Sequence, residues 1–527
     1  MRKYSIFYIG IYKEKICTQL DKFLKIYYNT LYNEYYCAYS HFTPKERLNL
    51  YFMSNKHKAI SVEEIARQKE YMSRVRASNE AVFASVGARP KAFALTLGCQ
   101  QNEADSERYM GMAIEMGYEK TDTPDDASLI IVNTCAIREH AEKRALSLIG
   151  QYKHIKAKNP DLLIVVCGCM VVQEHRVNDI KMRYPYVDIL LGPSLMHRLP
   201  EHVWQRKSGS KRIFDADAEE YAVAEGLPVS RESGFRAWVS VMYGCNNFCS
   251  YCIVPYVRGR ERSRRKEDVI AEVRELIESG YKDITLLGQN VNSYGKDSGF
   301  DYDFADLLAE LDTMGGDYIL HFMTSHPKDA TRKLVDVMAE ARHIARHFHL
   351  PMQSGSDEIL RRMNRRYDFA KYIDTLDYIR ERMPDITLTS DIIVGFPGES
   401  DDDFEDTIKA LKRARFDMIY SFQYSPRKGT PAAAMPDQVP QNVKAERFER
   451  LLAVQNEISL ASNKPLENTV VRVLCDGPSK NNKDIYSGRT DGGKIVFFDG
   501  TEEDIGRFLN IKIERADTFA LYGKIEK

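Results

Sequence analysis

The sequence predicts a multidomain α/β protein with three folded parts, and three observations indicate it. Residues 91–205 alternate apolar strand-like segments with helix-length segments, which is typical of a Rossmann-like parallel α/β domain. Residues 235–465 repeat the alternation about six times, which predicts a partial (β/α)6 barrel. Residues 466–527 switch to short strands separated by Asp-Gly turns, which favours a small five-stranded β-barrel.

In the first part, each of three expected strands leads into a cysteine. They are 92–97 with Cys99, 129–133 with Cys135, and 162–166 with Cys169. Helix-length segments between them indicate parallel strands, whose carboxyl ends share one edge of the sheet, where ligands bind. We therefore expect the three thiols to lie together, whereas Cys167 lies within an apolar strand and is expected in the core.

The barrel prediction rests on six strands with helical segments between them. The strands are expected near 238–243, 283–288, 317–323, 346–350, 386–394 and 417–423. Active sites of such barrels lie at the carboxyl ends of the strands. The first strand leads directly into a loop with three cysteines, so this loop is a candidate site.

That loop carries Cys245, Cys249 and Cys252 in a C-x3-C-x2-C spacing. A [4Fe-4S] cluster normally takes one cysteine per iron, so three cysteines leave one iron free to bind a small molecule. A structural zinc site needs four ligands, and neither this loop nor residues 256–258 supply a fourth Cys or His. The spacing therefore favours a cluster with an open iron, and hence catalysis.

The triplet resembles that of the radical S-adenosylmethionine (SAM) superfamily, and residues 244–259 resemble its methylthiotransferases. Methylthiotransferases carry a second set of three cysteines in Gly-Cys-Gln-x-Asn, Asn-Thr-Cys and Gly-Cys contexts. This chain matches those contexts at 98–102, 133–135 and 168–169, and the resemblance covers residues 91–527. It implies two [4Fe-4S] clusters, one on Cys99, Cys135 and Cys169 and one on Cys245, Cys249 and Cys252.

Within the family, residues 241–245, 288–292 and 324–327 resemble the branch that acts on N6-isopentenyladenosine in tRNA. The implied reaction replaces the hydrogen on carbon 2 of that base, beside the anticodon, with a methylthio group. It uses two SAM molecules, one as methyl donor to sulfur at the first cysteine set and one as radical source at the triplet. The anticodon arm suits such a reaction because its unstacked bases can be splayed into a pocket.

The resemblance also places SAM at the carboxyl ends of the later barrel strands. Segments after the second and fourth strands and along the fifth resemble the segments of the superfamily that hold SAM. The residues expected to contact it are Gln289, Asn290, Gln353, Ser390 and Asp391.

Two features indicate RNA as a partner. Residues 466–527 resemble the TRAM RNA-binding domain, but they hold 10 Lys or Arg against 11 Asp or Glu, so RNA contact requires a local patch. Six of the nine residues 258–266 are Arg or Lys, next to the expected active-site mouth. Phosphate contacts are expected from Arg258, Arg260, Arg264 and Arg265.

Three other functions remain open from the sequence. One is a sibling methylthiotransferase that acts on threonylcarbamoyl-adenosine in tRNA, and another is the sibling that modifies an aspartate of a ribosomal protein. The third is a non-enzymatic iron-sulfur carrier or RNA-binding scaffold. The open-iron triplet on a barrel argues against the third.

Composition indicates an intracellular enzyme. The 527 residues are 43% hydrophobic and 29% charged, with a net charge of −1 that says little about partners. Ten cysteines in metal-like spacings, without a secretory signal, indicate the reducing cytoplasm. Without an apolar run of about 18 residues, no membrane association is expected. We further expect a monomer served by a flavodoxin- or ferredoxin-type electron donor, while the sulfur donor is unknown.

Residues 1–90 are expected to form an N-terminal extension. Within it, 1–52 hold 10 of the 31 tyrosines without a clear period, and Met53 is an alternative start, which would make 1–52 an artefact. Residues 206–234 are aperiodic and charged, which predicts a linker. Residues 61–80 predict an amphipathic helix with an apolar side made of Val62, Ile65, Tyr71 and Val75.

Overall fold

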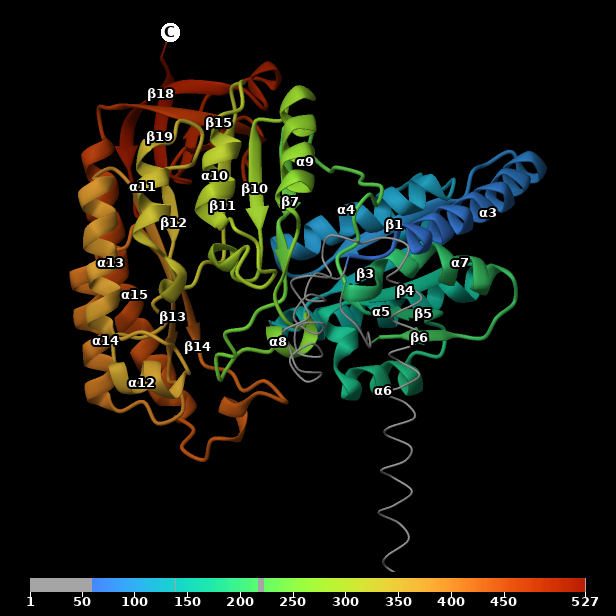
Figure 1. Cartoon of the computed structure of the whole chain (residues 1–527), viewed down its shortest axis with the longest axis horizontal. Helices are drawn as coiled ribbons and strands as arrows, with labels where there is room; N and C mark the ends of the chain where they lie inside the picture. Colours follow the sequence, from blue (N-terminus) through green and yellow to red (C-terminus); the bar gives the residue numbers. More distant parts are fainter. Residues whose placement is uncertain (1–58, 138, 217–221, 527) are drawn as a thin grey trace, which may run out of the picture. The chain divides into compact units, whose positions relative to one another are not determined.

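A computed structural model describes residues 59–137, 139–216 and 222–526, and Figure 1 shows their elements. The alternative start at Met53 lies outside these described residues. None of the described helices combines the length and apolar character that a membrane span requires.

The N-terminal part is built on one six-stranded sheet in which all neighbouring strands are parallel, in the order β2-β1-β3-β4-β5-β6. The strands are β1 (Lys91–Thr96), β2 (Glu119–Lys120), β3 (Leu129–Thr134), β4 (Leu163–Gly168), β5 (Ile189–Leu191) and β6 (Ile213–Asp215). The three strands predicted to precede cysteines are β1, β3 and β4, which are neighbours. The expectation that residues 206–234 form only a linker is wrong in one part, because they contain β6. This strand is too short to show a hydrophobic period in the sequence.

Two apolar cores cover the two faces of this sheet. Neighbouring residues alternate between them, with Ile131 and Val165 in one core and Ile130 and Ile164 in the other. Helices α3 (Val62–Val86), α4 (Gln100–Glu115) and α7 (Leu199–Lys207) pack on the first face, and α5 (Glu139–Lys158) and α6 (Glu174–Arg183) on the second. Burial on both faces explains the continuous apolar strands of the sequence.

Helix α3 exists as predicted, but its buried side is only partly the predicted one. Val75 is fully buried, whereas Val62 is 80% exposed. The Gln68 amide donates to Glu201 of α7 at 3.2 Å. Because half of the buried side is polar, apolar periodicity could not identify it; the buried residues are Gln68, Met72, Val75 and Asn79.

The middle part has six parallel strands in two groups of three, β7-β10-β11 and β12-β13-β14. Their bounds are β7 (Arg236–Ser240), β10 (Asp283–Leu287), β11 (Ile319–Phe322), β12 (His347–His349), β13 (Thr387–Val394) and β14 (Met418–Gln423). The groups meet where Leu320 of β11 forms a parallel bridge to Ile344, just before β12. The predicted partial (β/α)6 barrel is confirmed.

Helices follow the strands of this barrel and pack around one large apolar core. They are α9 (Lys266–Glu278), α10 (Phe304–Asp312), α11 (Arg332–Glu340), α12 (Asp357–Arg362), α13 (Phe369–Arg382), α14 (Asp401–Ala414) and α15 (Gln441–Asn463). The short strands β8 (Met242–Tyr243) and β9 (Arg262–Ser263) pair antiparallel and close the base of the cysteine loop. That loop contains the short helix α8 (Val254–Val257).

The C-terminal part is a closed barrel in the order β15-β16-β17-β19-β18, so the predicted five-stranded barrel is confirmed. Its strands are β15 (Val470–Pro478), β16 (Tyr486–Thr490), β17 (Ile495–Phe498), β18 (Phe508–Ala516) and β19 (Leu521–Ile525). Asp476 pairs with Arg236 at 2.7 Å, and Lys494 pairs with Asp417 at 2.7 Å. Since Arg236 begins β7 and Asp417 precedes β14, the small barrel covers the amino ends of the large one, opposite the cysteine loop (Figure 1).

Candidate active site

The first cysteine trio, defined as Cys99, Cys135 and Cys169, lies at the carboxyl edge of the N-terminal sheet. Cys99 directly precedes α4, Cys135 follows β3 and Cys169 follows β4. Glycines allow the loops to approach: a Cβ on Gly98 would lie 2.7 Å from that of Cys135, and one on Gly168 would lie 2.3 Å from the Thr134 carbonyl oxygen. The Gly-Cys pairs of the sequence are therefore steric requirements of this edge.

Gly168→Ala is a direct test of that requirement. Gly168 has φ 90° and ψ −164°, a conformation open essentially to glycine alone. Together with the clash against Thr134, alanine is expected to lower the free energy of unfolding by about 3 kcal/mol or more. Thermal unfolding measures the loss, and Gly209→Ala is the control because Gly209 has a similar φ of 91° but open space around it. Equal destabilisation by both substitutions would contradict the steric argument.

Asn102 connects the loops of the first trio. Its amide nitrogen donates to the carbonyl oxygens of Thr134 at 2.9 Å and Leu97 at 3.2 Å, and its side-chain oxygen lies 3.6 Å from the Cys99 sulfur. The asparagine of the Gly-Cys-Gln-Gln-Asn motif thus binds the backbone just before Cys99 and just before Cys135.

Arg258 does not face solvent, so its predicted contact with RNA is wrong. The side chain is 5% exposed and its Nε donates to the Cys169 sulfur at 3.0 Å. Its Nη1 forms an ion pair with Asp105 at 2.8 Å. The positive charge of Arg258 therefore lies inside the protein, in contact with Asp105 and with the first trio.

Arg264 is a second correction among the predicted RNA contacts. It is 4% exposed and pairs with Glu225 at 2.7 Å and Glu272 at 2.6 Å. These two half-buried carboxylates already neutralise Arg264, which leaves no free positive charge for a phosphate. Arg260 and Arg265 are exposed, so their RNA contacts stay predictions, although Arg265 pairs with Asp268 at 2.7 Å.

The second cysteine trio, defined as Cys245, Cys249 and Cys252, lies on the loop between β8 and α8. The Cys252 amide donates to the Cys249 carbonyl at 2.9 Å, and the Cys245 amide donates to the Gly259 carbonyl at 3.1 Å, so the loop is folded back on itself. Arg365, which follows α12, is buried and donates its Nη1 to the Cys249 sulfur at 3.3 Å. Each trio thus has one buried arginine on one of its sulfurs.

The protonation of these thiols is governed by burial. Burial raises the pKa of Cys245 and Cys252 to about 12, with nearby Lys328 opposing the shift at Cys245. Burial likewise raises the pKa of Cys169 to about 11, and Arg258 opposes it. Without a metal, Cys169, Cys245 and Cys252 are neutral at pH 7, and metal binding must release their protons.

The donor sets could hold iron-sulfur clusters. Among the described residues, no three His, Cys, Asp or Glu side chains are arranged around a single metal ion. A four-iron cluster places each cysteine on a different iron and therefore takes sulfurs spread more widely. Three thiols without a fourth ligand suit a cluster with one open iron.

The residues predicted to contact SAM lie at or near the carboxyl ends of β10, β12 and β13, but their surroundings differ. Gln289 accepts from the Gly244 amide and donates to Gln101 at 3.3 Å. The side-chain oxygens of Asn290 and Gln353 are buried without a hydrogen-bond partner among the described residues. Buried acceptors of this kind are costly, so both are suited to a ligand.

Ser390 and Asp391 are less available than the other three. The Ser390 hydroxyl donates to the Leu350 carbonyl at 3.0 Å and accepts from the Met352 amide at 2.8 Å. These bonds join β13 to the end of β12, which argues against a direct contact between Ser390 and SAM. Asp391 lies 3.6 Å from His349 and is half-buried.

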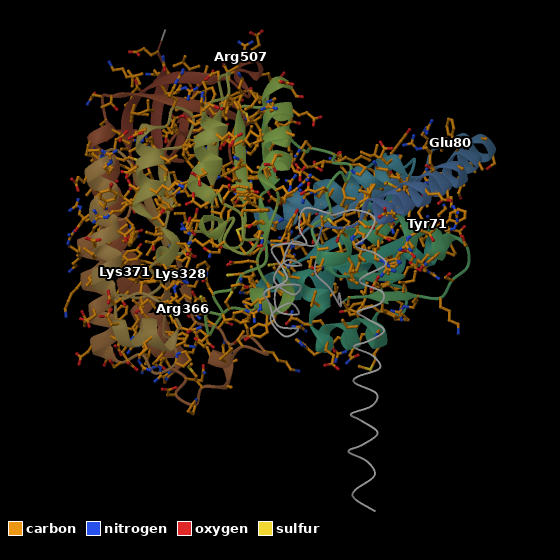
Figure 2. All side chains as sticks on the ribbon, viewed as in Figure 1. Tyr71, Glu80, Lys328, Arg366, Lys371 and Arg507 are labelled. Atoms are coloured by element: carbon orange, nitrogen blue, oxygen red, sulfur yellow. The ribbon has the colours of Figure 1, made fainter. Side chains whose placement is uncertain are left out.

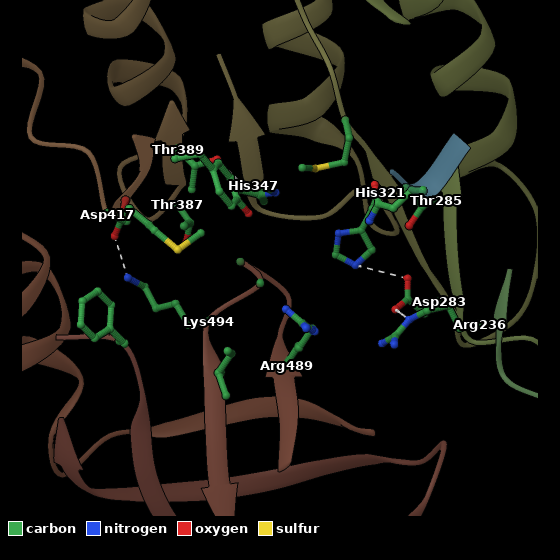
Figure 3. A pocket seen from close by; sticks show the side chains of 18 of the residues that line it. Arg236, Asp283, Thr285, His321, His347, Thr387, Thr389, Asp417, Arg489 and Lys494 are labelled. Atoms are coloured by element: carbon green, nitrogen blue, oxygen red, sulfur yellow. Dashed lines mark hydrogen bonds and ion pairs between the residues drawn. The ribbon is translucent and has the colours of Figure 1, made fainter. Parts of the chain in front are cut away.

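A cavity of about 350 Å³ lies between the amino ends of the large barrel's strands and the small barrel (Figure 3). Its wall includes Trp238 and Tyr420 of the large barrel, Lys494 of the small barrel, and Gln100, the residue after Cys99. Burial lowers the pKa of His347, another lining residue, to about 3, so this ring is neutral at pH 7. One cavity is therefore bounded by all three parts of the chain.

Protein-family models match all three parts. Residues 239–411 match the radical SAM superfamily, 91–192 match "Uncharacterized protein family UPF0004", and 465–525 match the TRAM domain. A protein of Acetivibrio thermocellus named tRNA-2-methylthio-N(6)-dimethylallyladenosine synthase is 45% identical over 481 residues, 91% of this chain and 98% of that protein. The chain belongs to this synthase family.

Other members of the synthase family are similarly close. One from Clostridium botulinum is 47% identical over 436 residues, 82% of this chain and 95% of that protein. One from a Thermoanaerobacter species is 45% identical over 466 residues, 88% of this chain and 98% of that protein. The chain is a radical SAM methylthiotransferase, and this superfamily implies a [4Fe-4S] cluster and SAM.

A solved structure also resembles the chain, the radical S-adenosylmethionine methyltransferase TsrM from Kitasatospora setae. It has a TM-score of 0.49 and 14% sequence identity, over 66% of this chain and 75% of that one.

Two residues of the synthase site escaped the sequence analysis. Gln101 donates to Ser240 at the end of β7 at 2.8 Å and accepts from Gln289, so it joins the sheet of the first trio to the barrel of the second. Arg365 lies in an arginine-rich segment, where charge alone suggests a surface. Gln101 had only its position two residues after Cys99 as a signal, and Arg365 had only the surrounding arginines, which predict a surface patch and not a buried contact.

Proposed function

We propose that this chain adds a methylthio group to carbon 2 of N6-isopentenyladenosine beside the tRNA anticodon and uses two SAM molecules for each product. The observation that carries the proposal is the juxtaposition of two cysteine trios, because Arg258 leaves the loop of one and contacts Cys169 of the other at 3.0 Å. The product named in the relatives that are 45–47% identical supports the choice of substrate.

The two trios have different tasks in this proposal. The second trio would hold the [4Fe-4S] cluster that binds SAM, and the first trio would hold a second cluster. When bound, these groups supply the electron that cleaves SAM and the site that holds sulfur. Around them, Asn290 and Gln353 would accept hydrogen bonds from SAM, and Lys328, close to Cys245, would face its carboxylate.

The cavity of Figure 3, which extends from the small barrel at the amino ends of the strands to Gln100 beside Cys99, is the proposed place of the target base. Trp238 and Tyr420 offer apolar, stacking surface that suits a purine with an isopentenyl group. The cations in the wall already have carboxylate partners: Lys494 pairs with Asp417 at 2.7 Å, Arg236 with Asp283 at 2.7 Å, and Arg489 with Asp476 at 3.3 Å. A substrate carboxylate would therefore compete with these aspartates for the cations and would lose its hydration on entry.

Substrate choice tests the proposal. We expect strong preference for tRNA that already bears isopentenyl, little product on unmodified adenosine, and essentially none on the threonylcarbamoyl form. Desolvating its unpaired carboxylate costs several kcal/mol. The measurement is mass spectrometry of nucleosides after both modified tRNAs compete in one anaerobic reaction with reconstituted enzyme, reductant, sulfide and SAM. Preferential conversion of the threonylcarbamoyl tRNA would assign the chain to the sibling activity instead.

The remaining assignments of the proposal concern RNA and cellular context. Arg260 and Arg265 would contact phosphates near the cysteine loop, and the C-terminal barrel would bind the anticodon arm. Figure 2 places Arg366 on the large barrel and Arg507 on the small one, far apart, so contacts between arginines and tRNA phosphates are expected along the molecule.

We also propose a cytoplasmic monomer with a flavodoxin- or ferredoxin-type electron donor. The proposed domains of the chain are 91–205, together with the helix α3 and the strand β6 that pack with it, then 235–465 and 466–527.

A further inference from the structure

Arg258 begins in one cysteine loop and ends at the other. It lies six positions after Cys252 in the sequence and directly follows α8. Its Nε donates to the Cys169 sulfur at 3.0 Å, across 89 residues of sequence. A buried cluster of apolar side chains packs the two loops together around this contact; its members are Ala136, Cys169, Ile253 and Val257.

The other two nitrogens of the Arg258 guanidinium also contact residues next to the first trio. Its Nη2 donates to the side-chain oxygen of Asn102 at 3.1 Å, and its Nη1 pairs with Asp105 at 2.8 Å. Asn102 in turn binds the Thr134 carbonyl, next to Cys135, and approaches the Cys99 sulfur. One buried cation is therefore linked directly to one cysteine of the first trio and through Asn102 to the other two.

We propose that Arg258 is a positioning residue that sets the reduction potential of the cluster held by the first trio and locks that trio against the SAM-binding loop. This inference rests on the two-cluster function proposed above. A hydrogen bond to a ligating sulfur and a buried positive charge both favour the reduced, more negative state of a cluster, so they raise its potential. The guanidinium supplies both to Cys169, and no change in its own protonation is required because arginine stays charged.

A purely structural role is the competing explanation, because Arg258 also neutralises buried Asp105. Two variants separate the explanations. Arg258→Lys keeps the charge beside Asp105 but lacks the planar fork that reaches sulfur, Asn102 and Asp105 together. Arg258→Gln combined with Asp105→Asn removes both charges, so no unpaired carboxylate remains buried.

The experiment uses the full chain with Cys245, Cys249 and Cys252 replaced by alanine, which leaves the first trio alone. After anaerobic reconstitution with iron and sulfide, a redox titration followed by electron paramagnetic resonance gives the midpoint potential. A chelator challenge gives the rate of iron loss, and circular dichroism verifies folding. Arg260→Gln is the matched control, because Arg260 lies two positions away but is exposed.

We expect a more negative potential in both Arg258 variants, because each loses the guanidinium hydrogen bond to the Cys169 sulfur, and about tenfold or faster iron loss. Arg260→Gln should change neither quantity. Folded variants with unchanged potential and unchanged iron loss would overturn the assignment of Arg258 and leave the two-cluster proposal intact. A triple-alanine background that takes up no cluster would instead refute the two-cluster proposal itself, and the inference with it.

Discussion

Replacing Cys245 with alanine is expected to abolish formation of 5′-deoxyadenosine from SAM. The second trio supplies three thiols, so removal of one leaves two, too few to hold a cluster with a single open iron. Reconstituted iron should fall from about eight per chain toward about four, because the first trio is untouched. Chromatography of the SAM products and an iron assay measure the two effects.

Cys475→Ala is the control for this experiment. Cys475 is also a buried cysteine, but it lies in the core of the C-terminal barrel, remote from both trios in the fold. Its substitution should leave iron content and SAM cleavage unchanged. Persistent formation of 5′-deoxyadenosine by the Cys245 variant would show that SAM is cleaved elsewhere.

Replacing Cys169 with alanine should stop methylthiolation of tRNA while cleavage of SAM to 5′-deoxyadenosine continues. Cys169 belongs to the first trio and receives the hydrogen bond from Arg258, whereas the loop that would bind SAM is held by its own contacts, including Arg365 to Cys249. Nucleoside mass spectrometry and measurement of 5′-deoxyadenosine in the same reaction separate the two activities.

The neighbouring Cys167 provides the matched control two positions away. It lies in β4, is fully buried, and belongs to the apolar core on one face of the sheet. Cys167→Ala should cost some stability through the lost packing but keep the methylthio product. Full product formation by the Cys169 variant would refute the sulfur-transfer task of the first trio.

Much of the fold could be predicted because its signals are local. Each barrel strand is a short apolar segment followed by a helix, and β13 at Thr387–Val394 was expected at 386–394. The short strands β5 and β6 were not predicted, because three residues are too few to show a period. Helix α3 agrees with the prediction, but its buried side agrees only in Val75, since Gln68 and Asn79 are buried through hydrogen bonds to distant residues.

The cysteine trios were also determined by the sequence alone. The second depends on spacing within one loop, and the first on strands whose parallel order follows from the helices between them, so neither required knowledge of distant contacts. The surroundings of the trios were decided only by the tertiary structure. In the sequence, Arg258 and Arg264 belong to one basic run, and charge predicts exposure. In the fold, Arg258 meets Cys169 and Asn102, which are 89 and 156 residues away, because burial depends on which distant segments pack together.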